Sequence, residues 1–133
     1  MNQARAQSTF LSVGIVLLTL FTAGCHLYFG LNGLRRPLNT YTVLFLLNGL
    51  GYLTLLAALT FPIPQLSGYR PLLRRVLAGY ATLTIVAWVF SVVVIHFGAI
   101  RLAYYTKVDE LALILFLWLA GRQATVRVEA QAS

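Results

Sequence analysis

His26 and Glu110 are the side chains in this sequence best suited to chemistry, because both lie in strongly apolar surroundings. His26 lies inside a long charge-free stretch, and Glu110 opens an apolar run that continues to Gly121. An imidazole can gain or lose a proton near neutral pH, and a carboxylate accepts several hydrogen bonds. Ionisable groups in membrane segments are costly unless they are paired, so they indicate a functional site. The structural alternative is a histidine bonded to a neighbouring helix and a glutamate solvated by lipid headgroups.

Asn48 and Trp88 are two further polar side chains within apolar stretches. In an up-and-down bundle, four such groups would approach one side of the membrane at depths of roughly 6–14 Å. Polar groups that converge from several helices form the binding sites of helix bundles. We therefore predict a ligand-binding site or polar core in which His26 and Glu110 lie within direct or water-mediated hydrogen-bond reach and Asn48 is the third member. Its four residues are His26, Asn48, Trp88 and Glu110.

A cofactor is not specified by the sequence. The two histidines, His26 and His96, fall on the first and third expected helices with an offset of roughly 12 Å, which disfavours bis-histidine haem ligation. The single cysteine, Cys25, excludes an internal disulfide and a multi-cysteine metal site. Phosphate-binding loops, dinucleotide fingerprints, nucleophile elbows and metalloprotease motifs do not occur. We therefore predict no catalytic residue and no metal, and haem, quinone and lipid stay open as ligands.

The composition indicates the environment that these residues occupy. Of the 133 residues, 59% are hydrophobic and 10% are charged, whereas a soluble domain carries about 25% charged residues. This is more apolar surface than a soluble fold of this length could bury, so a lipid bilayer is the expected partner. The net charge of +7 comes from basic residues between the apolar runs. That pattern favours anionic lipid headgroups and not nucleic acid.

The charge-free runs predict four helices. Three of them cover residues 6–34, 37–69 and 76–100, and the fourth covers only 111–121. A spanning helix needs about 20 apolar residues, so we expect an all-α transmembrane four-helix up-and-down bundle. It forms a single membrane domain, 1–133, with spans near 10–31, 41–61, 71–97 and 104–121. Gly49, Gly51 and Gly79 are expected where helices pack closely.

The fourth span is the shortest. The segment Thr106-Lys107-Val108-Asp109 matches a capping box, which predicts that the helix begins there. From Lys107 to Gly121 such a helix is roughly 22 Å long. This is short for a hydrocarbon core of about 30 Å, so either Tyr104 and Tyr105 extend the helix or part of it is enclosed by protein.

The segment ending at Cys25 resembles a lipoprotein cleavage site, which would remove the first span and attach lipid to the cysteine. Two observations argue against cleavage. Thr22 stands where such sites prefer leucine, and the apolar run continues to Leu34. Signal peptides have apolar regions of only about 7–15 residues. We therefore expect an uncleaved first span.

The basic residues also predict the orientation in the cell membrane. With both termini in the cytoplasm, six basic residues lie on that side and four on the other, which follows the positive-inside rule. The cytoplasmic six are Arg5, Arg70, Arg74, Arg75, Arg122 and Arg127. The opposite four are Arg35, Arg36, Arg101 and Lys107.

Four stretches together resemble an uncharacterised family of small four-span integral membrane proteins found in haloarchaea and bacteria. They are His26-Leu27-Tyr28-Phe29-Gly30, Phe45-Leu46-Leu47-Asn48-Gly49-Leu50-Gly51-Tyr52, Ala87-Trp88 and Thr106-Lys107-Val108-Asp109-Glu110-Leu111-Ala112-Leu113. Their order and spacing agree over most of the chain. The resemblance implies a four-helix membrane protein with an uncleaved first span. It implies no activity.

Two functions fit these expectations. The first is a non-enzymatic structural or accessory subunit of a membrane complex, since the short loops leave little chain outside the bilayer for chemistry. The second is a small redox or ligand-binding membrane protein, with His26 and Glu110 lining an intramembrane pocket for haem, quinone or lipid.

Overall fold

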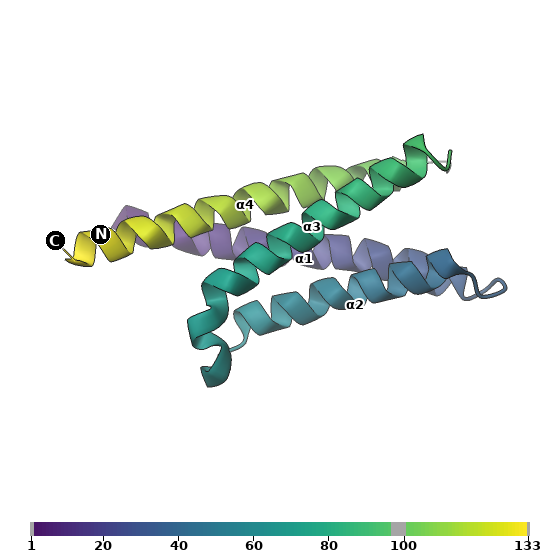
Figure 1. Ribbon diagram of the computed structural model, residues 1–133. Coiled ribbons are helices and arrows are strands. Elements are labelled where there is room, and N and C mark those ends of the chain that lie inside the picture. The colour runs from purple at the N-terminus through teal and green to yellow at the C-terminus, as the bar shows by residue number, and fades with distance from the viewer. Residues whose placement is uncertain (1, 97–100, 133) are drawn as a thin grey trace.

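Four long helices with short connections make up the part of the chain that the structure describes. The computed structural model describes residues 2–96 and 101–132, with side chains for 6–96 and 101–124. Helix α1 covers Asn2–Gly33, α2 Thr40–Thr60, the 3-10 helix η1 Pro64–Tyr69, α3 Arg70–Val93 and α4 Arg101–Ala132. Successive long helices run in opposite directions, so both termini lie at one end (Figure 1). The predicted all-α, up-and-down four-helix bundle is confirmed.

Local sequence signals explain where several helices begin and end. Asn39 caps α2, because its side-chain oxygen accepts a hydrogen bond from the Thr42 backbone N–H at 3.0 Å. Two prolines, Pro62 and Pro64, follow α2, and proline cannot continue the helical hydrogen-bond ladder. Pro71 lies in the first turn of α3, where its missing N–H has no cost. Helix α3 ends at Val93, and residue 97, its expected end, lies outside the described residues.

Helix α4 differs from its prediction in length. It begins at Arg101 and has 32 residues, which gives about 48 Å at the α-helical rise. The predicted capping box is wrong, because Thr106 lies inside the helix and its hydroxyl donates to the Ala103 carbonyl at 2.7 Å. The charges of Lys107 and Asp109 suggested the start of a helix, but they lie inside a continuous helix.

The helices pack in a ring, with α1 against α2 and α4, and α3 against α4 and α2. Buried side chains from all four helices form a small apolar core in the half of the bundle near the termini. Its members are Ile15, Ala23, Tyr52, Leu77, Ala81, Leu113 and Leu117. The outer faces are also apolar, as expected for contact with lipid tails.

Among the described residues, three helical segments are long and apolar enough to cross a bilayer. They are Ala6–Gly33, Thr40–Thr60 and Pro64–Val93. Their length, their hydropathy and their exposed apolar faces make this chain a membrane protein. Helix α4 is not one of the three, since Lys107, Asp109 and Glu110 interrupt its apolar sequence.

Glycines allow α1 and α2 to approach closely. A Cβ on Gly49 would lie 2.6 Å from Leu27 Cγ and 3.1 Å from the Ala23 carbonyl oxygen. One on Gly51 would meet the Tyr80 hydroxyl of α3. The close packing predicted at Gly49 and Gly51 is therefore confirmed. The prediction for Gly79 is wrong, because its Cβ position has no neighbour within 4 Å.

We expect Gly49→Ala to lower the free energy of unfolding by about 1–3 kcal/mol, because the added methyl group must push the two helices apart. Gly24→Ala is the matched control on α1, since that position is open. The control should be neutral or slightly stabilising, because alanine favours helix. Thermal unfolding of both variants in detergent measures the difference. Equal melting temperatures would contradict the close contact.

Candidate functional site

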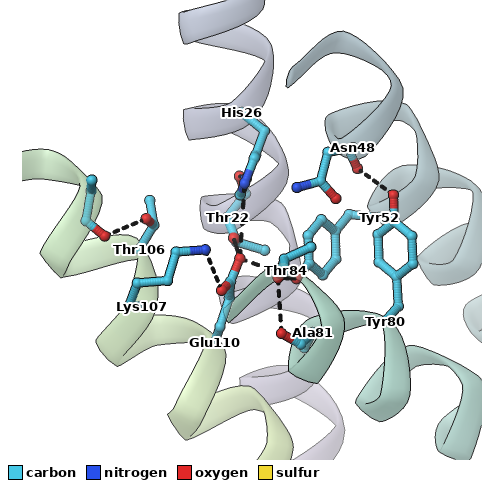
Figure 2. A network of polar contacts seen from close by, with 11 residues as sticks. Thr22, His26, Asn48, Tyr52, Tyr80, Ala81, Thr84, Thr106, Lys107 and Glu110 are labelled. Atoms are coloured by element: carbon cyan, nitrogen blue, oxygen red, sulfur yellow. Dashed lines mark hydrogen bonds and ion pairs between the residues drawn. The ribbon is translucent and has the colours of Figure 1, made fainter. Parts of the chain in front are cut away.

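The Glu110 carboxylate is the centre of a buried polar cluster (Figure 2). Its side chain is 0% exposed. One carboxylate oxygen, Oε1, accepts hydrogen bonds from Thr22 Oγ1 on α1 and from the Tyr52 hydroxyl on α2, each at 3.1 Å. The other, Oε2, accepts from Lys107 Nζ at 2.6 Å, one turn earlier on α4. Three helices thus bind one carboxylate.

The ion pair between Lys107 and Glu110 is enclosed by the bundle. Lys107 is only 8% exposed. Removing such charges from water costs several kcal/mol per ion, and close pairing with further hydrogen bonds is needed to offset that cost. The Nζ–Oε2 contact supplies the close pairing, and the two hydroxyl donors supply the further hydrogen bonds. The pair is therefore neutral as a unit and ties α4 to α1 and α2.

Thr84 links the fourth helix, α3, to this cluster. Its hydroxyl lies 2.9 Å from the Tyr52 hydroxyl and 2.8 Å from the Ala81 carbonyl oxygen. When Tyr52 donates its proton to Glu110, its oxygen can accept the Thr84 proton. Each hydroxyl has a single proton, so Thr84 donates either to the Tyr52 oxygen or to the Ala81 carbonyl at one time. The connection Thr84–Tyr52–Glu110 crosses the bundle.

The contacts of His26 fix its tautomer. Nδ1 lies 2.8 Å from the Thr22 carbonyl oxygen, which can only accept, so Nδ1 carries a proton. In the neutral ring Nε2 is then an acceptor. Nε2 is 3.9 Å from Glu110 Oε1, beyond hydrogen-bond distance, and an ion pair forms there only if the ring is protonated. The ring also packs against Phe45 and Tyr52, with centroids 5.9 and 5.8 Å away.

The four residues predicted from the sequence occupy different positions in this arrangement. His26 and Glu110 face each other from α1 and α4. Asn48 lies on α2, beside His26 (Figure 2), and its Oδ1 is buried without a hydrogen-bond partner among the described residues. Its backbone carbonyl accepts from the Tyr80 hydroxyl at 3.3 Å. Trp88 lies farther along α3, where it makes an edge contact with Tyr104 at 5.1 Å between ring centroids.

Tyr52, and not Asn48, supplies the α2 side chain that bonds Glu110. Three further members of the cluster were not predicted, Thr22, Thr84 and Lys107. Lys107 carried a usable signal, because residues three apart on a helix are neighbours and opposite charges at that spacing attract. The sequence gives no such signal for the two threonines, since threonine in an apolar helix commonly bonds its own backbone.

A cavity of about 460 Å³ lies next to the cluster, in the half of the bundle opposite the termini. Its walls come from all four helices and are mostly apolar. Among its polar side chains, those of His26, Asn48, Thr84 and Lys107 lie around Glu110 (Figure 2), whereas the Ser91 and Thr106 hydroxyls donate to backbone carbonyls of their own helices. Five aromatic rings also line it, those of Phe29, Tyr41, Phe45, Tyr80 and Trp88. Apolar walls with a few convergent polar groups are typical of small-molecule sites. The described residues contain no group of three or more His, Cys, Asp or Glu side chains that could hold a metal ion.

The cavity opens sideways between α2 and α3. Leu47 of α2 and Leu83 of α3 line it and are 59% and 64% exposed on the outer surface. The two helices approach each other near Tyr52 and Tyr80 and then diverge toward the start of α2 (Figure 1). In a bilayer this opening would face lipid.

Fold and site together define a class of protein, a four-helix membrane bundle with a buried polar cluster beside an aromatic-lined cavity. No protein-family model, no curated protein and no solved structure matches this chain. The family resemblance drawn from the sequence motifs therefore stays an expectation.

Proposed function

We propose that this protein binds a small, mostly apolar molecule taken directly from the bilayer. The observation that carries the proposal is the mostly apolar lateral cavity with polar side chains gathered beside Glu110 (Figure 2). An apolar body would replace lipid against the aromatic walls, and a polar head would meet His26 and Asn48. This is the ligand-binding alternative of the sequence analysis, in which haem, quinone and lipid were the candidate ligands.

The cluster supports binding better than it supports a reaction. Lys107 and Glu110 neutralise each other at 2.6 Å, so neither charge is available to attack a bound molecule. The hydrogen bonds to Thr22 and Tyr52 hold the pair in one position. A rigid cluster without net charge can border a pocket and orient a ligand there, because neighbouring polar atoms that lack a partner bind the ligand.

Native mass spectrometry of the protein released from mild detergent tests this proposal. We expect a mass increment of one small molecule per chain, and extraction with organic solvent should identify it. An absorption spectrum of the same sample would reveal haem as a Soret band. The accessory-subunit alternative predicts a chain without a small molecule that copurifies with other membrane proteins.

We also propose that α4 is a fourth span and that both termini are cytoplasmic. The charges that interrupt α4 are paired inside the bundle, so they do not prevent its insertion among the other helices. Lys107 therefore no longer counts as a flanking charge. The opposite side then keeps Arg35, Arg36 and Arg101, three basic residues against six.

We expect a reporter fused after Ser133 to score as cytoplasmic, and one inserted beside Arg36 to score as external, because an odd number of spans separates them. Arg35→Glu together with Arg36→Glu should strengthen this orientation. An external score at Ser133 would overturn the proposed orientation. Equal scores for Ser133 and the loop after Thr60 are expected, and different scores would exclude α4 as a span.

A further inference from the structure

We propose that the cavity selects a neutral ring compound carrying a hydroxyl group, of the chemical class of a membrane-soluble hydroquinone. This inference rests on the proposed binding function and specifies its ligand. It follows from the juxtaposition of a histidine acceptor, an asparagine amide and an aromatic wall around one apolar space.

The charges of the site favour a neutral ligand. Lys107 is the only Lys or Arg side chain among the described residues that line the cavity, and its Nζ is already bound to Glu110 Oε2 at 2.6 Å. The bond to Thr22 requires a proton on His26 Nδ1, and a neutral ring with this proton adds no charge to the site. An anionic headgroup would have to compete with Glu110 for Lys107, and a cationic one would meet Lys107 itself. A charged ligand would therefore carry a desolvation cost that this site does not offset.

The hydrogen-bonding atoms favour a hydroxyl group. Because His26 Nδ1 donates to the Thr22 carbonyl, Nε2 of the neutral ring presents a lone pair and can accept a hydrogen bond from a ligand. The Asn48 amide offers both donors and an acceptor, and its Oδ1 has no partner among the described residues. A hydroxyl can donate to Nε2 and accept from the amide at the same time. A quinone carbonyl can only accept, so it would leave Nε2 unsatisfied.

The walls favour a ring. Aromatic side chains prefer offset or edge contacts with other rings, and the cavity is bordered by five of them. Trp88 makes an edge contact with Tyr104, so the wall continues from α3 to α4. The volume of about 460 Å³ falls in the range of small-molecule sites, and a substituent on the ring could leave between Leu47 and Leu83 into lipid.

The test compares a decyl-substituted benzohydroquinone with its quinone and with its dimethyl ether, under anaerobic conditions in lipid nanodiscs. Quenching of Trp88 fluorescence reports binding, in a Trp118→Phe background because Trp118 lies on the outer surface. We expect the hydroquinone to bind about 10-fold more tightly than either analogue, since both analogues lack the O–H donor. His26→Leu should abolish this preference, whereas His96→Asn should preserve it, because His96 is exposed after α3 and asparagine tolerates its φ of 55°.

The outcomes separate the two proposals. A quinone or an ether that binds as tightly as the hydroquinone overturns the hydroxyl proposal but leaves the binding function in place. If none of the three compounds quenches Trp88 and native mass spectrometry finds another small molecule, the hydroxyl-ring proposal alone fails. If native mass spectrometry also finds the cavity without a bound molecule, both proposals fail. The comparison of the three compounds on the wild-type protein tests the hydroxyl proposal even if His26→Leu does not fold.

Discussion

Glu110→Leu is expected to lower the free energy of unfolding by about 3–5 kcal/mol, because removing one partner of a buried ion pair leaves the other charge uncompensated. Lys107 would lose its partner at 2.6 Å while staying enclosed between helices. Thr22 and Tyr52 would also lose their acceptor. Glu110→Gln should be milder, since the amide oxygen still accepts from both hydroxyls.

A double variant distinguishes the cost of an unpaired buried charge from the cost of changed packing at the site. When Lys107→Leu is added to Glu110→Leu, no unpaired charge is left, and apolar replacements of whole pairs are often neutral. The double variant should therefore recover much of the stability lost in the single one. Thermal unfolding in the same detergent measures all of these variants. A single variant as stable as the wild type would show that Glu110 is solvated at headgroup level, and a double variant as unstable as the single one would show that packing dominates.

The sequence predicted the number and order of the helices because charge-free runs report directly on contact with lipid. It did not predict the length of α4, which begins at Arg101 and continues to Ala132, beyond the expected last residue Gly121. The late start was expected because Lys107 and Asp109 were interpreted as a cap at the first turn. A charge ends an apolar helix only if it must reach water. Here Lys107 and Glu110 satisfy each other on one face of the helix, and this depends on tertiary packing that a one-dimensional count of charges does not contain.

The sequence predicted the positions of the site residues along the bundle axis to within about one helical turn. Counting residues from helix ends brought His26 and Glu110 to the same level, where the structure places them 3.9 Å apart. The same count selected Asn48, whereas the side chain that bonds Glu110 belongs to Tyr52, one turn further along α2. One turn is about 5.4 Å, which is larger than a hydrogen bond. The ends of helices vary by a residue or two, so partners cannot be assigned by counting.

Ala103→Trp is expected to abolish binding of the copurifying small molecule, because the indole would project from α4 into the cavity that Ala103 lines. Apolar burial in this space is the main source of affinity in the proposed function, and a filled cavity cannot provide it. The bound molecule should fall from stoichiometric amounts to traces in native mass spectra. The loss should occur without unfolding, since Ala103 lies outside the apolar core and its side chain makes none of the hydrogen bonds of the Glu110 cluster.

Val108→Trp is the matched control on the same helix. Val108 is 65% exposed on the outer surface and does not line the cavity. The Val108→Trp variant places the same indole in contact with lipid, so ligand binding should stay at the wild-type level. Equal loss in both variants would point to a general disturbance of α4. Full binding in Ala103→Trp would place the ligand outside this cavity, on the lipid-facing surface of the bundle. Loss confined to Ala103→Trp requires that the molecule occupy the space between the aromatic walls and the Lys107–Glu110 pair, where the polar cluster can orient it.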